Sequence, residues 1–124
     1  MAQLKAQPKN FAEALAVLNG RQSKRLGNNT YLENFVGLQF IGVRLHNTYI
    51  VRFHYNRQIT LHSGGYRTVT TKDRVNQFIS GRVFQKAHQW YYDYPLVQVE
   101  GRGINTERVR VPFVEGMNIA QEML

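Results

Sequence analysis

The 124-residue sequence contains no cysteine, so it can form neither a disulfide framework nor a metal site with thiolate ligands. It also lacks any run approaching the roughly 18 apolar residues that a membrane-spanning helix needs, and its first residues lack the apolar core of a signal peptide. A chain of this length can bury a sufficient core without covalent staples. We therefore expect a single domain over residues 1–124, with no membrane partner and a cytoplasmic location.

Negative charge is scarce as well. Eight Asp and Glu stand against sixteen Lys and Arg, eleven of them Arg, which leaves a net charge of +8. No Asp or Glu lies between Asn34 and Lys72, although an ordinary protein surface mixes both signs. Arginine suits forked contacts with phosphate, and seven Tyr, seven Phe and one Trp add rings for stacking. These features favour an anionic partner over the alternative, in which the rings fill a β core and the arginines keep the surface soluble.

The N-terminal part combines an unpatterned start with one helix. Residues 1–8 have no hydrophobic period and are expected to be mobile. Asn10 can cap a helix that Gly20 ends, with an apolar stripe made of Phe11, Ala14, Leu15 and Leu18. The basic segment 21–25 is interpreted as a loop that could meet phosphate, and 27–29 as a turn that leads into the first strand.

Residues 39–62 alternate apolar and polar positions and predict three antiparallel strands. One face would carry Ile41, Val43, Leu45, Tyr49, Val51, Phe53, Tyr55, Ile59 and Leu61. Matching these apolar positions requires three-residue connections at 46–48 and 56–58. The resulting register puts Val43 opposite Val51 and Phe53 opposite Leu61.

The same register gathers cations and hydroxyls on the opposite face. It predicts the pairs Arg44 with Ile50, Arg52 with His62, and His54 with Thr60. A one-sided antiparallel sheet always has a solvated face, but this one has no carboxylate in the sequence around it. The candidate residues for binding nucleic acid or another anion are Arg44, Arg52, His54, His62 and Arg67, with Lys72 and Arg74 at the margin and Tyr49 and Tyr66 for stacking.

The spacing of three histidines suggests a metal site, because His46, His54 and His62 are eight residues apart. His46 falls in a predicted turn, however, and the region lacks the carboxylate or thiolate groups that usually complete or support such a site. We expect no metal and no cofactor. A metal-independent nuclease with paired histidines stays open as an alternative, since acid-base catalysis needs only well-spaced groups that titrate near neutral pH.

The segment 63–71 marks the change from strand to helix. Its adjacent Gly64 and Gly65 predict a turn in which at least one residue has positive φ. Thr70 as N-cap, with Asp73 in a capping box, would start a helix whose apolar side chains are Val75, Phe78 and Ile79. The turn is also similar to a phosphate loop, but it lacks the Lys-Ser or Lys-Thr ending, so we interpret it as a turn before a capped helix.

The C-terminal third predicts a second hairpin and a last strand. The hairpin turns at Ala87 and His88, and its buried side would consist of Val83, Trp90 and Tyr92. Residues 101–106 are interpreted as a flexible loop, and 108–113 as a strand that alternates arginine with valine. Gly116 should end the ordered region or begin a short helix.

Long strings of the sequence resemble a known family. They are residues 27–31 (GNNTY), 43–51 (VRLHNTYIV), 63–76 (SGGYRTVTTKDRVN) and 81–85 (GRVFQ). Together, over most of residues 27–92, they are similar to a family of small uncharacterised proteins encoded by tailed bacteriophages and their metagenomic relatives. The resemblance implies a phage protein in the host-cell cytoplasm and brings no catalytic assignment. It favours either a nucleic-acid-binding accessory protein or a counter-defence protein.

The expected fold is α+β: an N-terminal helix packed on a bent, mostly antiparallel sheet or partial barrel of about six to eight strands, with one short inserted helix. The expected function is non-catalytic binding of nucleic acid through the basic sheet face. The main alternative is a counter-defence or regulatory protein that binds a nucleotide-like ligand or an acidic host protein, and the second is the nuclease. The sequence is also compatible with a homo-oligomer.

Overall fold

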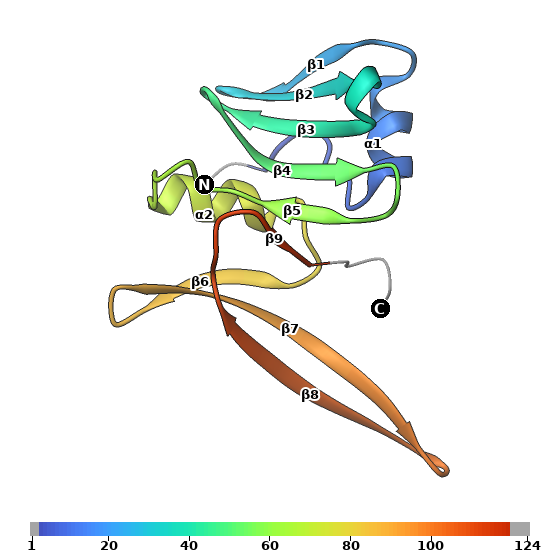
Figure 1. Cartoon of the computed structure of the whole chain (residues 1–124), viewed down its shortest axis with the longest axis vertical. Coiled ribbons are helices and arrows are strands. Elements are labelled where there is room, and N and C mark those ends of the chain that lie inside the picture. The colour runs from blue at the N-terminus through green and yellow to red at the C-terminus, as the bar shows by residue number, and fades with distance from the viewer. Residues whose placement is uncertain (1–2, 120–124) are drawn as a thin grey trace.

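Two antiparallel sheets and two α-helices form residues 3–119, the part of the chain described by the computed structural model (Figure 1). The helices are α1 (Phe11–Leu18) and α2 (Val69–Asn76), and a short 3-10 helix spans Val36–Leu38. The larger sheet has the strand order β1 (Ser23–Gly27), β2 (Thr30–Phe35), β3 (Phe40–Leu45), β4 (Thr48–His54), β5 (Ile59–Leu61) and β9 (Met117–Asn118). The smaller sheet consists of β6 (Arg82–Lys86), β7 (Gln89–Glu100) and β8 (Gly103–Pro112). These open sheets and the N-terminal helix confirm the α+β prediction.

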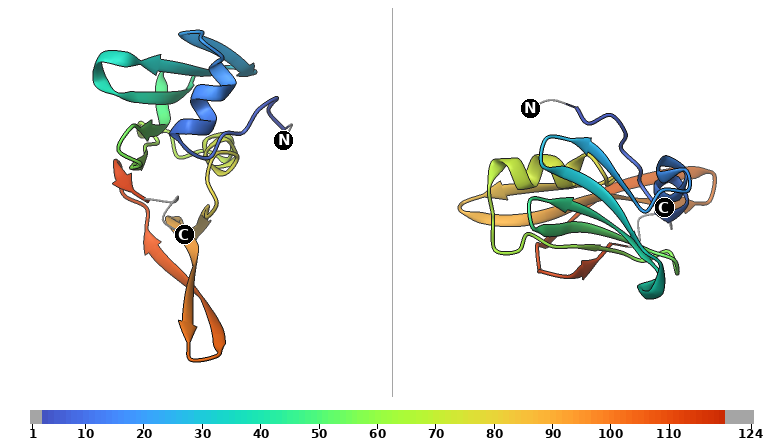
Figure 2. Two further views of the ribbon diagram at one scale, coloured as in Figure 1. Left: turned by 90° about the vertical axis from the view of Figure 1, so that its right-hand side faces the viewer. Right: turned by 90° about the horizontal axis from the view of Figure 1, so that it is seen from above.

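Helix α1 begins at the predicted cap, because Asn10 Oδ1 accepts a hydrogen bond from the Glu13 N–H at 2.8 Å. Its C-cap is Asn19, one residue before the predicted Gly20, and Asn19 takes the left-handed conformation with φ 49°. Ala14 and Leu18 are buried, whereas Leu15 is 45% exposed and does not belong to the buried stripe. The helix lies against β2, β3 and β4 and covers one side of the larger sheet (Figures 1 and 2).

The N-terminal segment and the edge of the larger sheet differ from the local sequence signals. Leu4 is buried and donates its N–H to Gln77 Oε1 at 2.9 Å, within the segment for which mobility is expected. The predicted basic loop at 21–25 is wrong, because residues from Ser23 onward form β1 and pair with β2. A polar, basic composition is typical of an exposed edge strand as well as of a loop, and only the pairing partner distinguishes them.

The predicted faces of β3, β4 and β5 are correct except at Tyr49 and Tyr55, and part of the register is wrong. Tyr49 pairs with Arg44 on the side away from the core, and Tyr55 follows β4 and is 69% exposed. Val43 pairs with Val51 as predicted, after which a bulge shortens the connection to a two-residue turn at 46–47. Phe53 pairs with Ile59 instead of Leu61, so this register is shifted by two residues. A shift of two leaves every side chain on its own face, because side chains alternate with a period of two.

The bulge and the shift change the predicted neighbours on the polar side. Arg44 pairs with Tyr49 and not with Ile50, which the bulge turns into the core. Arg52 pairs with Thr60 and not with His62. His54 is likewise not the cross-strand partner of Thr60, although their side chains lie 3.1 Å apart. The three differences share one cause, since turn lengths and bulges are set by backbone geometry and not by the apolar pattern alone.

Helix α2 begins two residues earlier than predicted. Thr68, not Thr70, is the N-cap, and its Oγ1 accepts a hydrogen bond from the Thr71 N–H at 3.1 Å. The capping box with Asp73 is therefore absent. Gly64 and Gly65 have φ of 62° and 83°, which confirms the positive φ predicted for this turn.

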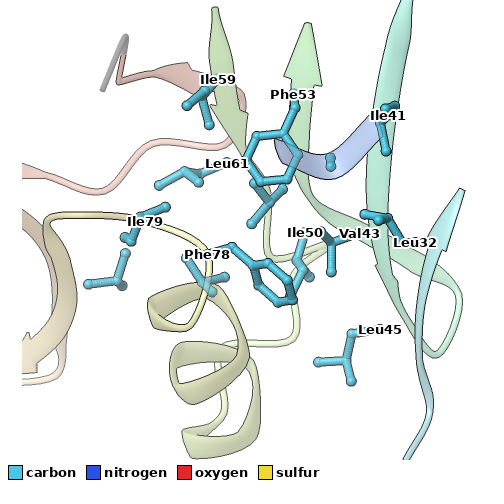
Figure 3. Packing of buried hydrophobic residues seen from close by; sticks show 14 of the residues in the cluster. Leu32, Ile41, Val43, Leu45, Ile50, Phe53, Ile59, Leu61, Phe78 and Ile79 are labelled. Atoms are coloured by element: carbon cyan, nitrogen blue, oxygen red, sulfur yellow. The ribbon is translucent and has the colours of Figure 1, made fainter. Parts of the chain in front are cut away.

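One apolar core joins the larger sheet to α2 and to the residues that follow it. The predicted cluster of Val43, Val51, Phe53 and Leu61 is fully buried. Figure 3 shows Phe53 and Leu61 facing Phe78 and Ile79 from the end of α2. Because α2 contacts both β4 and β6, this core also positions the smaller sheet.

The smaller sheet confirms one prediction and corrects another. Ala87 and His88 form the predicted turn, both with positive φ, and Val83, Trp90 and Tyr92 are buried. The predicted loop at 101–106 is wrong, because β8 already begins at Gly103 and pairs with β7 up to the tip. In the larger sheet, the prediction that Gly116 ends the ordered region or begins a short helix is also wrong, because Met117–Asn118 form β9 at the edge of β5.

Candidate nucleic-acid interface

The side of the larger sheet away from the core carries the residues singled out by the sequence. Strand alternation places ten half-buried side chains on this outer face: Tyr31, Glu33, Phe35, Phe40, Arg44, Tyr49, Arg52, His54, Thr60 and His62. The structure thus brings Arg44, Tyr49, Arg52, His54 and His62 to one face. It also adds Glu33 from β2, which lies just before the sequence segment without carboxylates and reaches this face only through the pairing of β2 with β3.

Glu33 neutralises the first predicted anion-binding residue. Its carboxylate accepts hydrogen bonds from Arg44 Nε at 3.2 Å and from the Tyr49 hydroxyl at 2.6 Å. Arg44 also lies over the ring of Tyr31, 4.6 Å from its centroid. Burial raises the pKa of Glu33, but the hydrogen bonds from Tyr49 and Arg44 outweigh it, so that the pKa is lowered. Arg44 therefore already has a counter-ion, and the Tyr49 hydroxyl is engaged.

A row of rings runs along the middle of the outer face. Phe35 stacks on Phe40 with ring centroids 4.7 Å apart, and Tyr49 meets Phe35 edge-on at 5.1 Å. Phe40 in turn lies 5.6 Å from the His54 ring. Such rings on a sheet surface are a platform on which unpaired bases can stack.

Arg52 is a half-buried cation of the outer face that forms no ion pair with another described residue. Its guanidinium lies over Phe40, 5.6 Å from the ring centroid, and its Nε is buried without a hydrogen-bond partner among the described residues. His54 and His62 flank it, and His54 Nε2 lies 3.1 Å from Thr60 Oγ1. Burial first, and then the positive charge of Arg52, lower the pKa of both histidines. The site thus combines one permanent cation with two imidazoles that are neutral at pH 7.

The remaining predicted cations are not on the strands of the outer face, since Arg67 lies in the segment before α2, and Lys72 and Arg74 lie on α2. Arg67 stacks over Trp90 and Phe113 and forms an ion pair with Glu115 at 3.5 Å. Lys72 Nζ lies 5.7 Å from the Trp90 ring centroid. Arg74 is only 6% exposed, so its side chain is not accessible to a ligand at the surface. Tyr66, by contrast, is 67% exposed and presents its ring to solvent beside the β3–β4 turn.

The turn at Ser63 and Gly64 binds an anion, and that anion is the carboxylate of Glu115 from the same chain. The Glu115 carboxylate accepts hydrogen bonds from the Ser63 N–H at 2.7 Å, the Ser63 hydroxyl at 2.5 Å and the Gly64 N–H at 3.2 Å. Burial raises the pKa of Glu115, but these bonds and the charge of Arg67 lower it overall. No local signal connects Glu115 to Ser63, since they are 52 positions apart.

Sequence reasoning missed a second cluster of arginine and aromatic residues. It lies on the smaller sheet and contains Arg82, Phe84, Tyr91 and Arg110. The alternation of arginines in the last strand is the signal that could have found it, because it places Arg108 and Arg110 on one face.

Neither a metal site nor a membrane span is found in residues 3–119. No group of three or more His, Asp or Glu within this part of the chain could hold a metal ion. None of its helices is long and apolar enough to cross a membrane.

The comparisons with known proteins identify a family and no activity. Searches of curated proteins and of solved structures gave no match. A family model described as Kyanoviridae Gp96 protein matches residues 8–120, which includes the strings on which the resemblance to phage proteins rests. The chain therefore belongs to the Kyanoviridae Gp96 protein family, a family of phage proteins.

Proposed function

We propose that this phage protein binds nucleic acid, without catalysis, through the outer face of the larger sheet in the host cytoplasm. The observation that carries the proposal is the environment of Arg52, a half-buried guanidinium over an aromatic ring with no carboxylate partner among the described residues. A phosphate is the ligand that such a group suits best, because the planar guanidinium can donate two parallel hydrogen bonds to it.

The energetic argument starts from the unpartnered Nε. A buried donor without an acceptor costs about 1–3 kcal/mol, and an ion in a partly desolvated position is stabilised by an opposite charge. A phosphate that draws the Arg52 guanidinium outward would give Nε an acceptor and the positive charge a counter-ion. Phe40 supports this motion, since a guanidinium can slide over a ring without losing the contact.

The two histidines add a hydrogen-bonding and a titratable component. At pH 7 His54 and His62 are neutral, so each can donate one hydrogen bond and accept one. A phosphate beside them favours their protonated forms, which adds positive charge when it is needed. Binding should therefore be coupled to proton uptake.

The aromatic row favours single strands as the form of nucleic acid bound. Phe35, Phe40 and Tyr49 follow one another away from Arg52, so bases attached to a phosphate at Arg52 would reach them. Base stacking requires unpaired bases, which a duplex does not offer.

The test is a titration of labelled single-stranded DNA and RNA oligonucleotides with the full chain at several salt concentrations. Arg52→Ala should weaken binding, and Arg52→Lys should recover only part of it because lysine cannot make the forked contact. Lys5→Ala is the control, since Lys5 is exposed, belongs to neither sheet and carries the same charge. Equal affinities of the parent and the Arg52→Ala variant would contradict the proposal.

Two results would support the alternatives instead. Failure of the parent to bind any oligonucleotide at low salt, together with binding of a mononucleotide or an acidic host protein, would support the counter-defence function. Cleavage of RNA in the presence of EDTA, lost in His54→Gln or His62→Gln, would support a metal-independent nuclease.

A further inference from the structure

The outward side of the smaller sheet carries a stripe of cations built around two stacked rings. Phe84 and Tyr91 stack with ring centroids 5.7 Å apart. Arg110 lies over both rings, at 4.7 and 5.9 Å from their centroids, and Arg82 lies over Phe84 at 5.0 Å. The contacts with the rings hold both guanidiniums in place. Both arginines are nevertheless exposed, so their guanidiniums also face solvent.

Cross-strand pairing extends this cluster into a continuous stripe. Arg82 and Arg110 both flank Asp93 on the central strand, and Lys86 and Arg108 lie on the same side of the sheet. The spacing of Lys86 and Arg108 along the strands corresponds to about 20 Å at about 3.3 Å per residue. We call these four residues, Arg82, Lys86, Arg108 and Arg110, the basic stripe.

The basic stripe is poorly neutralised. Asp93 is the carboxylate on this side, and it is 6% exposed and bound to Arg108, with Nη2 and Oδ2 3.2 Å apart. Glu107 falls on the opposite side, between Arg108 and Thr106 in an alternating strand. Arg82, Lys86 and Arg110 form no ion pair with another described residue.

We propose that the basic stripe binds the phosphate backbone of duplex nucleic acid. Two guanidiniums lie over Phe84 and one of them also over Tyr91, so the cluster presents cations to solvent above its rings. What the stripe offers is a rigid row of outward N–H donors. A duplex presents about one negative charge per 1.7 Å of its axis, so it supplies phosphates along the whole stripe, whereas a flexible strand must first be ordered.

The shape of the smaller sheet supports a duplex over a flat acidic protein surface. β7 and β8 continue past the end of β6 as a two-stranded arm, residues 95–108, that projects from the rest of the molecule (Figures 1 and 2). An isolated two-stranded ribbon is marginally stable in water. Its two backbones lie about 5 Å apart, and a two-stranded ribbon can enter a major groove about 12 Å wide.

This inference shares the partner class of the proposed function but rests on different residues, so the two can fail separately. The experiment titrates the full chain with a 20-base-pair DNA duplex and with one of its strands, over a series of salt concentrations. The variant is Arg82→Gln with Arg110→Gln, which removes two charges and keeps polar groups over the rings. The control is Lys5→Ala with Arg57→Ala, two exposed residues outside both sheets.

For the Arg82/Arg110 variant we expect weaker duplex binding and a plot of log affinity against log salt that is shallower by about two, since each phosphate contact contributes about 0.9. Single-strand binding should stay sensitive to Arg52→Ala and change little in this variant. Duplex affinity equal to that of the control would overturn the inference, as would a loss of binding to an acidic protein with duplex binding unchanged. Circular dichroism verifies that the variant is folded.

Discussion

The carboxylate of Glu115 is held by the backbone and hydroxyl of Ser63, at 2.7 and 2.5 Å, across the gap between the end of β5 and the segment that leads into β9. The N–H groups of this glycine-rich loop could bind an external anion, but here they bind Glu115. We call these contacts, together with the ion pair between Glu115 and Arg67, the latch. The latch holds the C-terminal segment that brings β9 to the edge of β5.

The latch predicts a pH-dependent loss of stability. Glu115→Gln should lower the free energy of unfolding by about 1 kcal/mol at pH 7, a value limited by the partial exposure of the side chain. The folded-state pKa of Glu115 is lowered, so its contribution is present above the ordinary value of 4.5 and is lost as the pH falls through the folded-state pKa. Urea unfolding at a series of pH values from 7 down to about 2.5 should show a constant difference between parent and variant above about pH 5 and a shrinking difference below it. A difference that stays constant over the whole series would contradict this account.

Gly64 and Gly65 form a matched pair for testing the turn. A Cβ on Gly64 would lie 2.6 Å from Thr48 Oγ1, whereas a Cβ on Gly65 meets nothing within 4 Å, and both residues have positive φ. Gly65→Ala should cost about 1 kcal/mol from the backbone conformation alone. Gly64→Ala should cost more, because the clash adds to it. Thermal denaturation compares them, and equal melting temperatures for the two variants would show that the contact with Thr48 relaxes freely.

The core predicts a large loss at Phe53, which is fully buried between the larger sheet and the end of α2. Phe53→Ala should reduce the free energy of unfolding by about 3–5 kcal/mol through lost burial and a cavity. Val36→Ala is the control, since Val36 is 74% exposed and should change it by less than about 0.5 kcal/mol. Denaturant titration of both variants measures the difference.

The two arginines of the outer face should differ in their effect on binding. Arg52→Ala should reduce the salt slope for single strands by about one, because it removes one phosphate contact. Arg44→Ala should change the slope less, because Glu33 already neutralises Arg44. The two variants are compared by titration at four or more salt concentrations, and an equal reduction by both would show that Glu33 releases Arg44 on binding.

Affinity for single strands should increase as the pH falls below 6.5, the ordinary pKa of histidine from which His54 and His62 are lowered. The sign follows from linkage: a bound phosphate raises both pKa values, so the complex takes up protons and acid favours it. Fluorescence titrations from pH 7.5 to 5.5 measure the effect. In the His54→Gln and His62→Gln double variant the affinity should become nearly independent of pH, and an unchanged pH dependence there would assign it to other groups.

Much of the secondary structure was predictable because it depends on short-range patterns. Alternation in residues 39–62 assigned side chains to faces, Asn10 specified the start of α1, and the paired glycines specified a turn with positive φ. The same alternation explains why Val43, Val51, Phe53 and Leu61 were correctly placed in the core. A period of two, however, leaves a register shift of two residues undetected, which is the error between β4 and β5.

The sequence by itself determined the faces of the strands, the excess of positive charge and membership of a phage protein family. Tertiary structure decided which charges have partners: it placed Glu33 beside Arg44 and Glu115 beside Arg67, buried Arg74 and left Arg52 without a carboxylate. Pairing also turned a basic segment into β1 and added β9 to β5. The physical reason is the same in each case, because local pattern sets the direction of a side chain, whereas its neighbour across a sheet comes from a distant part of the chain.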